Sequence, residues 1–161
     1  MSAALSATVW LTAIGCALMA GVYLTFSSFV MRSLDALPEP GAVAAMQSIN
    51  REILSSGFMP LFFGTSLASL ALGAWGVAHW GDAGTRALAA GGLVYVLGMF
   101  VCTAAFNVPL NEALDAVEPG APEATHAWAD YLRRWTRYNH LRTLASTVAT
   151  GLFLAAAVSL T

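Results

Sequence analysis

The sequence predicts an all-α integral membrane protein in which four transmembrane helices form a bundle. Of its 161 residues, 58% are hydrophobic and 10% are charged, whereas about 25% of the residues of a soluble domain are charged. Mean hydropathy is +0.68. The apolar residues form four stretches, each long enough at about 1.5 Å per residue to cross a hydrocarbon core of roughly 30 Å. These predicted spans are residues 7–31, 57–80, 87–108 and 141–160.

The first stretch, residues 7–31, is predicted to be a retained span rather than a cleaved signal peptide. A signal peptide has a positively charged start and a short apolar core, but no Lys or Arg precedes Arg32 and the apolar run continues to Met31. Small residues in this span would let a second helix approach closely. They are Gly15, Ala17, Ala20 and Gly21.

A turn and a short amphipathic helix are predicted between the first two spans. Pro38 and Pro40 cannot continue a helix, and Gly41 permits a sharp turn. In residues 42–54, several positions then share one helical face. They are Val43, Met46, Asn50, Ile53 and Leu54. Asn50 is therefore a polar residue on an apolar face.

The second span leads through a short turn to the third, which ends in a pair of asparagines. Pro60 lies near the start of the second span, where proline is tolerated. In the stretch FNVPLN, Asn107 and Asn111 share a face if the helix continues. Pro109 predicts either a kink or the start of a new helical segment. A helix cap at Asn107 and a solvated Asn111 remain the alternative.

A helical extension is predicted to lead into the fourth span without a break. No glycine or proline occurs from Thr125 to Thr150, so nothing in this stretch interrupts a helix. The chain contains no internal repeat, low-complexity tail or linker. Residues 1–161 are therefore predicted to form one domain.

The charge distribution predicts how the chain is oriented in the membrane and argues against nucleic acid as a partner. Two long loops, residues 32–56 and 107–142, are predicted on one side of the membrane, and the termini with residues 80–86 on the other. The first side contains six arginines and the second only Arg86. The positive-inside rule then places the long loops in the cytoplasm, in a plasma or inner membrane. The chain has no lysine and no basic run, which argues against nucleic acid and against a polybasic lipid-binding tail.

Polar and aromatic residues gather where the fourth span begins. Asn139 lies one helical turn before Arg142, with Trp135 and Tyr138 close to the same stripe. Together with the asparagines described above, they predict a polar pocket at one end of the bundle. Its substrate-binding residues are predicted to be Asn50, Asn107, Asn111, Trp135 and Tyr138. Tryptophans that only anchor the membrane interface remain the alternative.

The residue types of this pocket indicate a chemistry. Asparagine donates and accepts hydrogen bonds without titrating, and arginine stays protonated and stabilises a negative oxygen. This suits an oxygen-rich organic ligand that passes through an enolate or phenolate. Asn139, Arg142 and His140 are the predicted catalytic residues. His140 is the first candidate for the proton acceptor, ahead of Glu112 and Asp115.

A metal site is not predicted. His79, His126 and His140 share no local spacing, and His79 is expected at the opposite face of the membrane. Cys16 and Cys102 are isolated within spans and are predicted to be packing residues. A mononuclear site formed by His126, His140 and a carboxylate remains an alternative.

Four stretches of the chain carry a resemblance to a known family. They are GVYLTFSSFVMRSL, AMQSIN, FNVPLN and WTRYNHLRT. With them the chain resembles the DUF1772 family, also called anthrone oxygenase-like proteins, which are small four-span membrane proteins. The resemblance covers essentially the whole chain. The resemblance implies functional roles for the residues of this chain that lie in these motifs. They are Asn50, Asn107, Pro109, Asn111, Trp135, Asn139, His140 and Arg142.

The resemblance implies an activity, the oxidation of an anthrone to an anthraquinone by molecular oxygen without a bound flavin or heme. In this hypothesis Asn107, Asn111 and Asn139 bind the carbonyl and the neighbouring hydroxyls. Arg142 stabilises the enolate, and His140 accepts the proton. O₂ is then a co-substrate, and no other cofactor is expected.

Three other functions stay open from the sequence. The bundle could bind a quinone or another lipid-soluble molecule without turnover, serve as a structural membrane subunit, or act as a small transporter. Four spans without an intramembrane carboxylate give a transporter little to couple to protons. The expected partners are the lipid bilayer and a hydrophobic small molecule, and assembly with further copies of the chain is left open.

Overall fold

The computed structural model describes residues 2–160, which are helical throughout except for short connections. No strand occurs among these residues. The elements are α1 (Ala3–Thr25), the π-helix η1 (Phe26–Val30), α2 (Met31–Asp35), α3 (Glu39–Ser55), α4 (Phe58–Ala78), α5 (Ala83–Tyr95), the π-helices η2 (Val96–Val101) and η3 (Thr103–Asn107), α6 (Val108–Asp115) and α7 (Ala124–Ser159).

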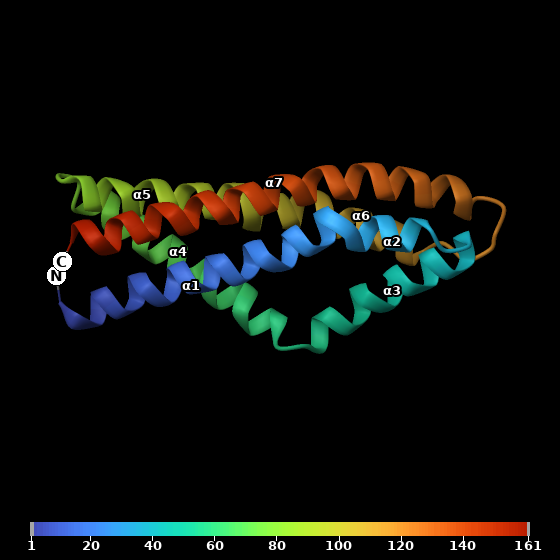
Figure 1. Cartoon of the computed structure of the whole chain (residues 1–161), viewed down its shortest axis with the longest axis horizontal. Helices are drawn as coiled ribbons and strands as arrows, with labels where there is room; N and C mark the ends of the chain where they lie inside the picture. The colour runs from blue at the N-terminus through green and yellow to red at the C-terminus, as the bar shows by residue number, and fades with distance from the viewer. Residues whose placement is uncertain (1, 161) are drawn as a thin grey trace.

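Four helical stretches are long and apolar enough to cross a membrane, which confirms the predicted four-span, all-α integral membrane bundle. They are Ala3–Asp35, Phe58–Ala78, Ala83–Asp115 and Ala124–Ser159. Both termini lie at one end of the bundle, close to the turn between α4 and α5 (Figure 1). The predicted amphipathic helix is present as α3, and the predicted helical extension is the first half of the unbroken α7.

The two long loops predicted at residues 32–56 and 107–142 do not exist as loops. Those residues form α2, α3, α6 and the first half of α7, and we call these four segments the cap. The predicted spans stop where charged residues begin. Each cap helix is charged on one side and apolar on the other, so the helices continue past those charged residues. The first, third and fourth spans therefore continue beyond their predicted limits at the cap end.

The molecule has two apolar cores, one in the spans and one in the cap. The membrane core contains buried side chains of all four spans, among them Val9, Met19, Phe62, Leu72, Tyr95, Met99 and Phe153. The cap core consists of Met31, Leu34, Ala42, Val43, Met46, Leu110, Leu114, Trp128, Tyr131 and Trp135. Burial of these apolar faces holds the short helices α2 and α6 in place, since helices of such length are marginal on their own.

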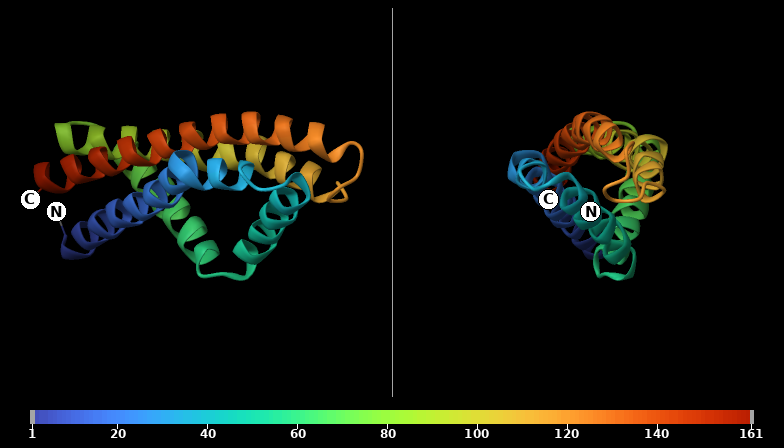
Figure 2. Two further views of the ribbon diagram at one scale, coloured as in Figure 1. Left: turned by 45° about the vertical axis from the view of Figure 1, so that its right-hand side comes forward. Right: turned by 90° about the vertical axis from the view of Figure 1, so that its right-hand side faces the viewer.

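An elbow between α3 and α4 gives the bundle an open side. The chain turns at Ser56, whose backbone is extended and whose hydroxyl accepts a hydrogen bond from the Phe58 amide at 3.2 Å. Figure 2 shows that α3 and α4 form the two arms of a V whose point lies to one side of the bundle. Residues of both arms, among them Ile53, Leu54 and Phe58, line a cavity at the junction of the two cores.

Two π-helical segments lie at this same junction. η1 begins at Phe26 in the first span, and η3 begins at Thr103 in the third. A π-helical turn shifts the direction of the side chains that follow it and occurs frequently at functional sites. The third span then continues into α6, with Pro109 in its first turn, so that Pro109 opens a new helical segment.

The contact between α4 and α5 depends on glycine and gives a first prediction. A methyl group on Gly92 would lie 2.5 Å from the carbonyl oxygen of Ser69 and 2.6 Å from Cα of Gly73. Gly92→Ala is therefore expected to destabilise the protein by about 1–3 kcal/mol through overpacking. Gly64→Ala is the matched control, because no atom lies within 4 Å of its added methyl. Thermal unfolding in detergent should show a loss only for Gly92→Ala; equal unfolding temperatures would contradict the close approach.

Candidate functional site

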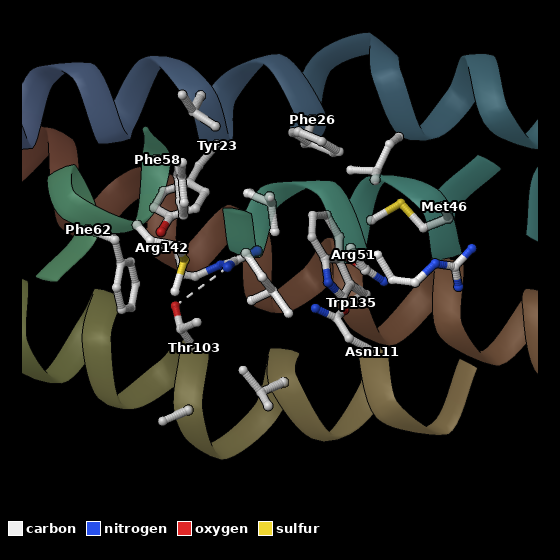
Figure 3. A pocket seen from close by; sticks show the side chains of 18 of the residues that line it. Tyr23, Phe26, Met46, Arg51, Phe58, Phe62, Thr103, Asn111, Trp135 and Arg142 are labelled. Carbon is white, nitrogen blue, oxygen red and sulfur yellow. Dashed lines mark hydrogen bonds between the residues drawn. The ribbon is translucent and has the colours of Figure 1, made fainter. Parts of the chain in front are cut away.

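A cavity of about 400 Å³ lies between the membrane core and the cap core (Figure 3). Its walls come from the end of α1, α3, the start of α4, η3, α6 and α7. A volume of this size falls in the range of sites for small organic ligands. Thr103 on its wall is about 30 Å along the helix from Ala83 at the opposite end of the bundle, which places the cavity at one boundary of the hydrocarbon layer.

Aromatic rings form much of this cavity, and we call it the aromatic cavity. The rings of Phe62 and Phe100 have centroids 5.5 Å apart, and Phe58 stacks on Phe62 at 6.0 Å. On the cap side, the Phe26 ring lies 5.6 Å from the ring of Trp135. Flat apolar walls of this kind favour a ligand with fused aromatic rings.

Arg142 projects into the aromatic cavity and is only 5% exposed. Its guanidinium carbon lies 4.4 Å from the ring centroid of Tyr23 and 5.0 Å from that of Trp135. Its Nη1 donates to the hydroxyl of Thr103 at 3.4 Å, as Figure 3 shows. None of the ion pairs of residues 2–160 involves this arginine. The cavity therefore contains a buried positive charge with no protein counter-ion, an arrangement that is costly and typical of functional sites in membranes.

Asn139 holds Arg142 in position. Its side chain is fully buried, and its Oδ1 accepts a hydrogen bond from Nη2 of Arg142 at 2.7 Å. Its Nδ2 donates to the carbonyl of Tyr23 and to the hydroxyl of Ser27, both at 2.7 Å. Asn139 is not among the residues that line the cavity. It therefore links α7 to the end of α1 and orients the arginine, without direct access to a ligand.

Three buried nitrogen donors on residues that line the aromatic cavity have no hydrogen-bond partner among the described residues. They are Nε of Arg142, Nε1 of Trp135 and Nδ2 of Asn50. Asn111 also lines the cavity, and its Oδ1 accepts a hydrogen bond from the hydroxyl of Tyr131 at 3.0 Å. Buried donors normally have partners, so this donor set suits a ligand with oxygen acceptors.

The structure brings together only some of the residues predicted for the pocket. Arg142, Trp135, Asn50 and Asn111 line the aromatic cavity. Asn107 is buried behind the wall, where its Nδ2 donates to the carbonyl of Trp135 at 3.3 Å.

Two predicted residues lie elsewhere on α7. Tyr138 stacks on Phe106 at a centroid distance of 4.4 Å, outside the cavity. His140 is exposed and lines a different hollow. For His140 the reason is helical phase: residues 135, 139 and 142 share one face of a continuous helix, and residue 140 is turned away from it. Tyr138 lies at the edge of that face, and its ring packs on Phe106 instead. The structure therefore does not bring His140 to the arginine that it was expected to assist.

Two carboxylates line the aromatic cavity, and both lie on α6. Asp115 forms an ion pair with Arg51 of α3 at 2.8 Å. Glu112 is exposed and has no ion-pair partner in the described part of the chain. Among the proton-acceptor candidates from the sequence, Glu112 is therefore the one that lines the cavity without an ion-pair partner in the described residues.

No group of three His, Cys, Asp or Glu side chains within residues 2–160 is arranged to hold a metal ion. His126 and His140 both lie on α7, and their separation along the helix is about 21 Å. Ligands of one zinc ion lie about 2 Å from the metal, so these two histidines of one chain do not meet at one ion.

A model of a known protein family matches the chain. The family model described as anthrone oxygenase matches residues 53–152, which is more than half of the chain. The matched segment includes α4, the third span, Asn111, Trp135 and Arg142, but it excludes Asn50 and all of α3 before residue 53. No curated protein and no solved structure matches the chain.

Proposed function

The chain belongs to the anthrone oxygenase family, and from this premise we propose that it oxidises anthrone-type polycyclic phenolic ketones with O₂ through a stabilised enolate. The observation that carries the proposal is Arg142, a buried cation without a counter-ion in a cavity with aromatic walls. Such a cation attracts an anion that forms within the cavity more strongly than it attracts the neutral ketone.

The proposed reaction converts the CH₂ group opposite the ketone into a carbonyl. Loss of one proton from this carbon gives an electron-rich aromatic enolate. The enolate carbon forms a bond to O₂ and is oxidised, while O₂ is reduced to a peroxide anion. This anion takes back the proton lost in the first step and becomes a hydroperoxide. Loss of water from the hydroperoxide leaves the quinone carbonyl, so that one CH₂ and one O₂ give one C=O and one H₂O. The aromatic enolate reacts with O₂ directly, and the proposal therefore uses no further cofactor.

In the proposed complex, the donors of the cavity hold the oxyanion. Arg142 supplies the positive charge, and the indole N–H of Trp135 and the amide of Asn50 supply neutral hydrogen bonds. Asn111 contacts the phenolic hydroxyls of the substrate. Preorganised donors of this kind stabilise a transition state because they need no rearrangement when charge develops. The phenylalanine rings form the apolar walls that hold the fused rings of the substrate. The cavity lies at a membrane depth that a poorly soluble substrate reaches from the bilayer.

The proton acceptor in this proposal is Glu112. Glu112→Gln removes the base but retains the size of the side chain, and is expected to lower kcat by about 10²-fold. Glu118→Gln is the matched control, since Glu118 is exposed outside the cavity. Quinone formation measured against pH should show that alkaline solution partly restores the Glu112→Gln rate, because hydroxide replaces the missing base. A normal rate for this variant would remove Glu112 from the mechanism.

The proposal includes an orientation, with the cap in the cytoplasm. Six arginines lie at the cap end and only Arg86 at the other, which agrees with the positive-inside rule. The six are Arg32, Arg51, Arg133, Arg134, Arg137 and Arg142.

Oxygen uptake by the purified protein with a hydroxylated anthrone tests the proposed function. We expect uptake above the spontaneous rate, one O₂ per quinone formed, and no effect of a strong chelator. Uptake that a chelator abolishes would require a metal. No uptake, together with a ligand-dependent rise in unfolding temperature, would instead favour a binding protein for quinones or related lipophiles.

A further inference from the structure

A second hollow, of about 340 Å³, lies on the outside of the bundle and shares no lining residue with the aromatic cavity. Its basic side chains come from segments far apart in the sequence. Arg32 belongs to α2, and Arg133, Arg137 and His140 belong to α7. We call this region the basic hollow. The sequence has no basic run, but the fold brings basic residues of α2 and α7 together at one surface.

The basic hollow carries an excess of positive charge. Its one carboxylate, on Asp35, already accepts a hydrogen bond at 3.0 Å from an indole N–H of α7. Arg133 pairs with Asp130 at 2.7 Å. Arg137 has no ion-pair partner anywhere in residues 2–160. The hydroxyl of Thr136 also lines the hollow, and it is buried without a hydrogen-bond partner among the described residues. These groups together suit an anion with several oxygen acceptors, such as a phosphate.

The depth of the basic hollow corresponds to the lipid headgroups. The distance along α7 from Ser159, at the other end of the helix, to His140 is about 28 Å, close to the hydrocarbon thickness of roughly 30 Å. Arg137 and Arg133 lie about one and two turns farther out. The basic side chains therefore begin where the acyl chains of the bilayer end.

The face of α7 that carries the basic hollow becomes apolar toward the middle of the membrane. Leu144 follows His140 by four residues and Arg137 by seven, and Val148 follows Leu144 by four, so they continue the same face. Leu144 is 62% exposed and Val148 is 42% exposed. A phosphate site that continues directly into an exposed apolar stripe matches a phospholipid, with its headgroup above its acyl chain, better than it matches a free anion.

We propose that the basic hollow binds the phosphate headgroup of an anionic phospholipid whose acyl chain lies along Leu144 and Val148. Basic pockets between helices at the membrane surface bind such headgroups. A zwitterionic phospholipid is held less tightly, because its ammonium group meets arginines. The site is independent of the chemistry in the aromatic cavity.

The test compares lipids on the purified full-length protein in a neutral detergent, with the unfolding temperature as the readout. Phosphatidylglycerol is expected to raise this temperature, whereas phosphatidylcholine with the same acyl chains has little effect. Arg137→Gln should need about 5-fold more phosphatidylglycerol for the same rise, the loss expected for one arginine at a membrane surface. Arg134→Gln is the matched control, because it removes an exposed arginine of the same helix that does not line the hollow.

Three outcomes would overturn the proposal. They are equal effects of the two lipids, an unchanged lipid requirement in Arg137→Gln, and an equal loss in Arg137→Gln and Arg134→Gln. Inorganic phosphate is included at matched concentration to distinguish the two sources of the anion. A rise with inorganic phosphate as large as that with phosphatidylglycerol would assign the hollow to a soluble phosphate compound instead. Because the side chain of Arg137 is exposed, its replacement is not expected to prevent folding.

Discussion

Arg142→Met is expected to lower the rate of anthrone-dependent oxygen uptake by about 10²–10³-fold, the usual effect of removing one main oxyanion donor. Methionine retains an unbranched apolar side chain in the same space and removes the charge. The effect should appear in kcat more than in KM, because the arginine interacts with the enolate much more strongly than with the neutral ketone. Oxygen-electrode measurements on purified variants give both parameters.

The same variant should remain folded. Arg142 is buried without a counter-ion, so its removal relieves a desolvation cost that offsets the lost hydrogen bonds to Asn139 and Thr103. We therefore expect an unfolding temperature equal to or above that of the wild type. Arg134→Met, on the exposed side of the same helix, serves as the control and should not affect turnover. A fully active Arg142→Met protein would exclude the arginine from the reaction.

The second large effect is expected for Asn139→Asp, which places a carboxylate beside the guanidinium of Arg142. The Oδ1 of Asn139 accepts a hydrogen bond from Nη2 at 2.7 Å, and an aspartate at this distance would form an ion pair. The positive charge would then be compensated by the protein and would stabilise an enolate far less. We expect kcat to fall by about 10²-fold.

The comparison of the two Asn139 variants separates charge from position. Asn139→Ala removes the hydrogen bond to Arg142 and the link to Ser27, which should cost about 1.5–3 kcal/mol of stability. Its arginine keeps an uncompensated charge, so part of the activity should remain. Wild-type activity in Asn139→Asp would contradict the claim that turnover requires an arginine without a counter-ion.

The spans and the two longest cap elements could be predicted because they carry long, regular signals. The apolar face of α3 recurs at helical spacing, and α7 contains no breaker from Thr125 to Thr150. The helices α2 and α6 are too short to show a period, so the sequence predicts loops there. Their apolar residues, Leu34 and Leu114 among them, gain a partner only in the cap core.

The candidate site was predictable only where a polar residue interrupts an apolar face. Asn50, Asn111, Trp135 and Arg142 carry this signal, and all four line the aromatic cavity. The phenylalanine wall is not predictable, since every face of an apolar span looks alike in sequence and nothing marks Phe62 or Phe100 as lining residues. His140 is close to Arg142 in the chain, but a helix turns residues two apart to different faces, so this proximity does not bring their side chains together. The basic hollow was not predictable either, because it joins α2 to α7.

The most direct test of the central claim is an anaerobic spectrophotometric titration of a hydroxylated anthrone bound to the purified protein. Without O₂ no turnover occurs, and the absorption of the enolate reports the ionisation of the ligand. A cation within a few ångströms should lower the pKa of the bound ligand by about 1–3 units relative to the same ligand in empty detergent micelles. We predict this shift for the wild-type protein and its loss in Arg142→Met. Identical titration curves in the wild type, in Arg142→Met and in micelles would contradict the claim that the buried arginine stabilises the enolate.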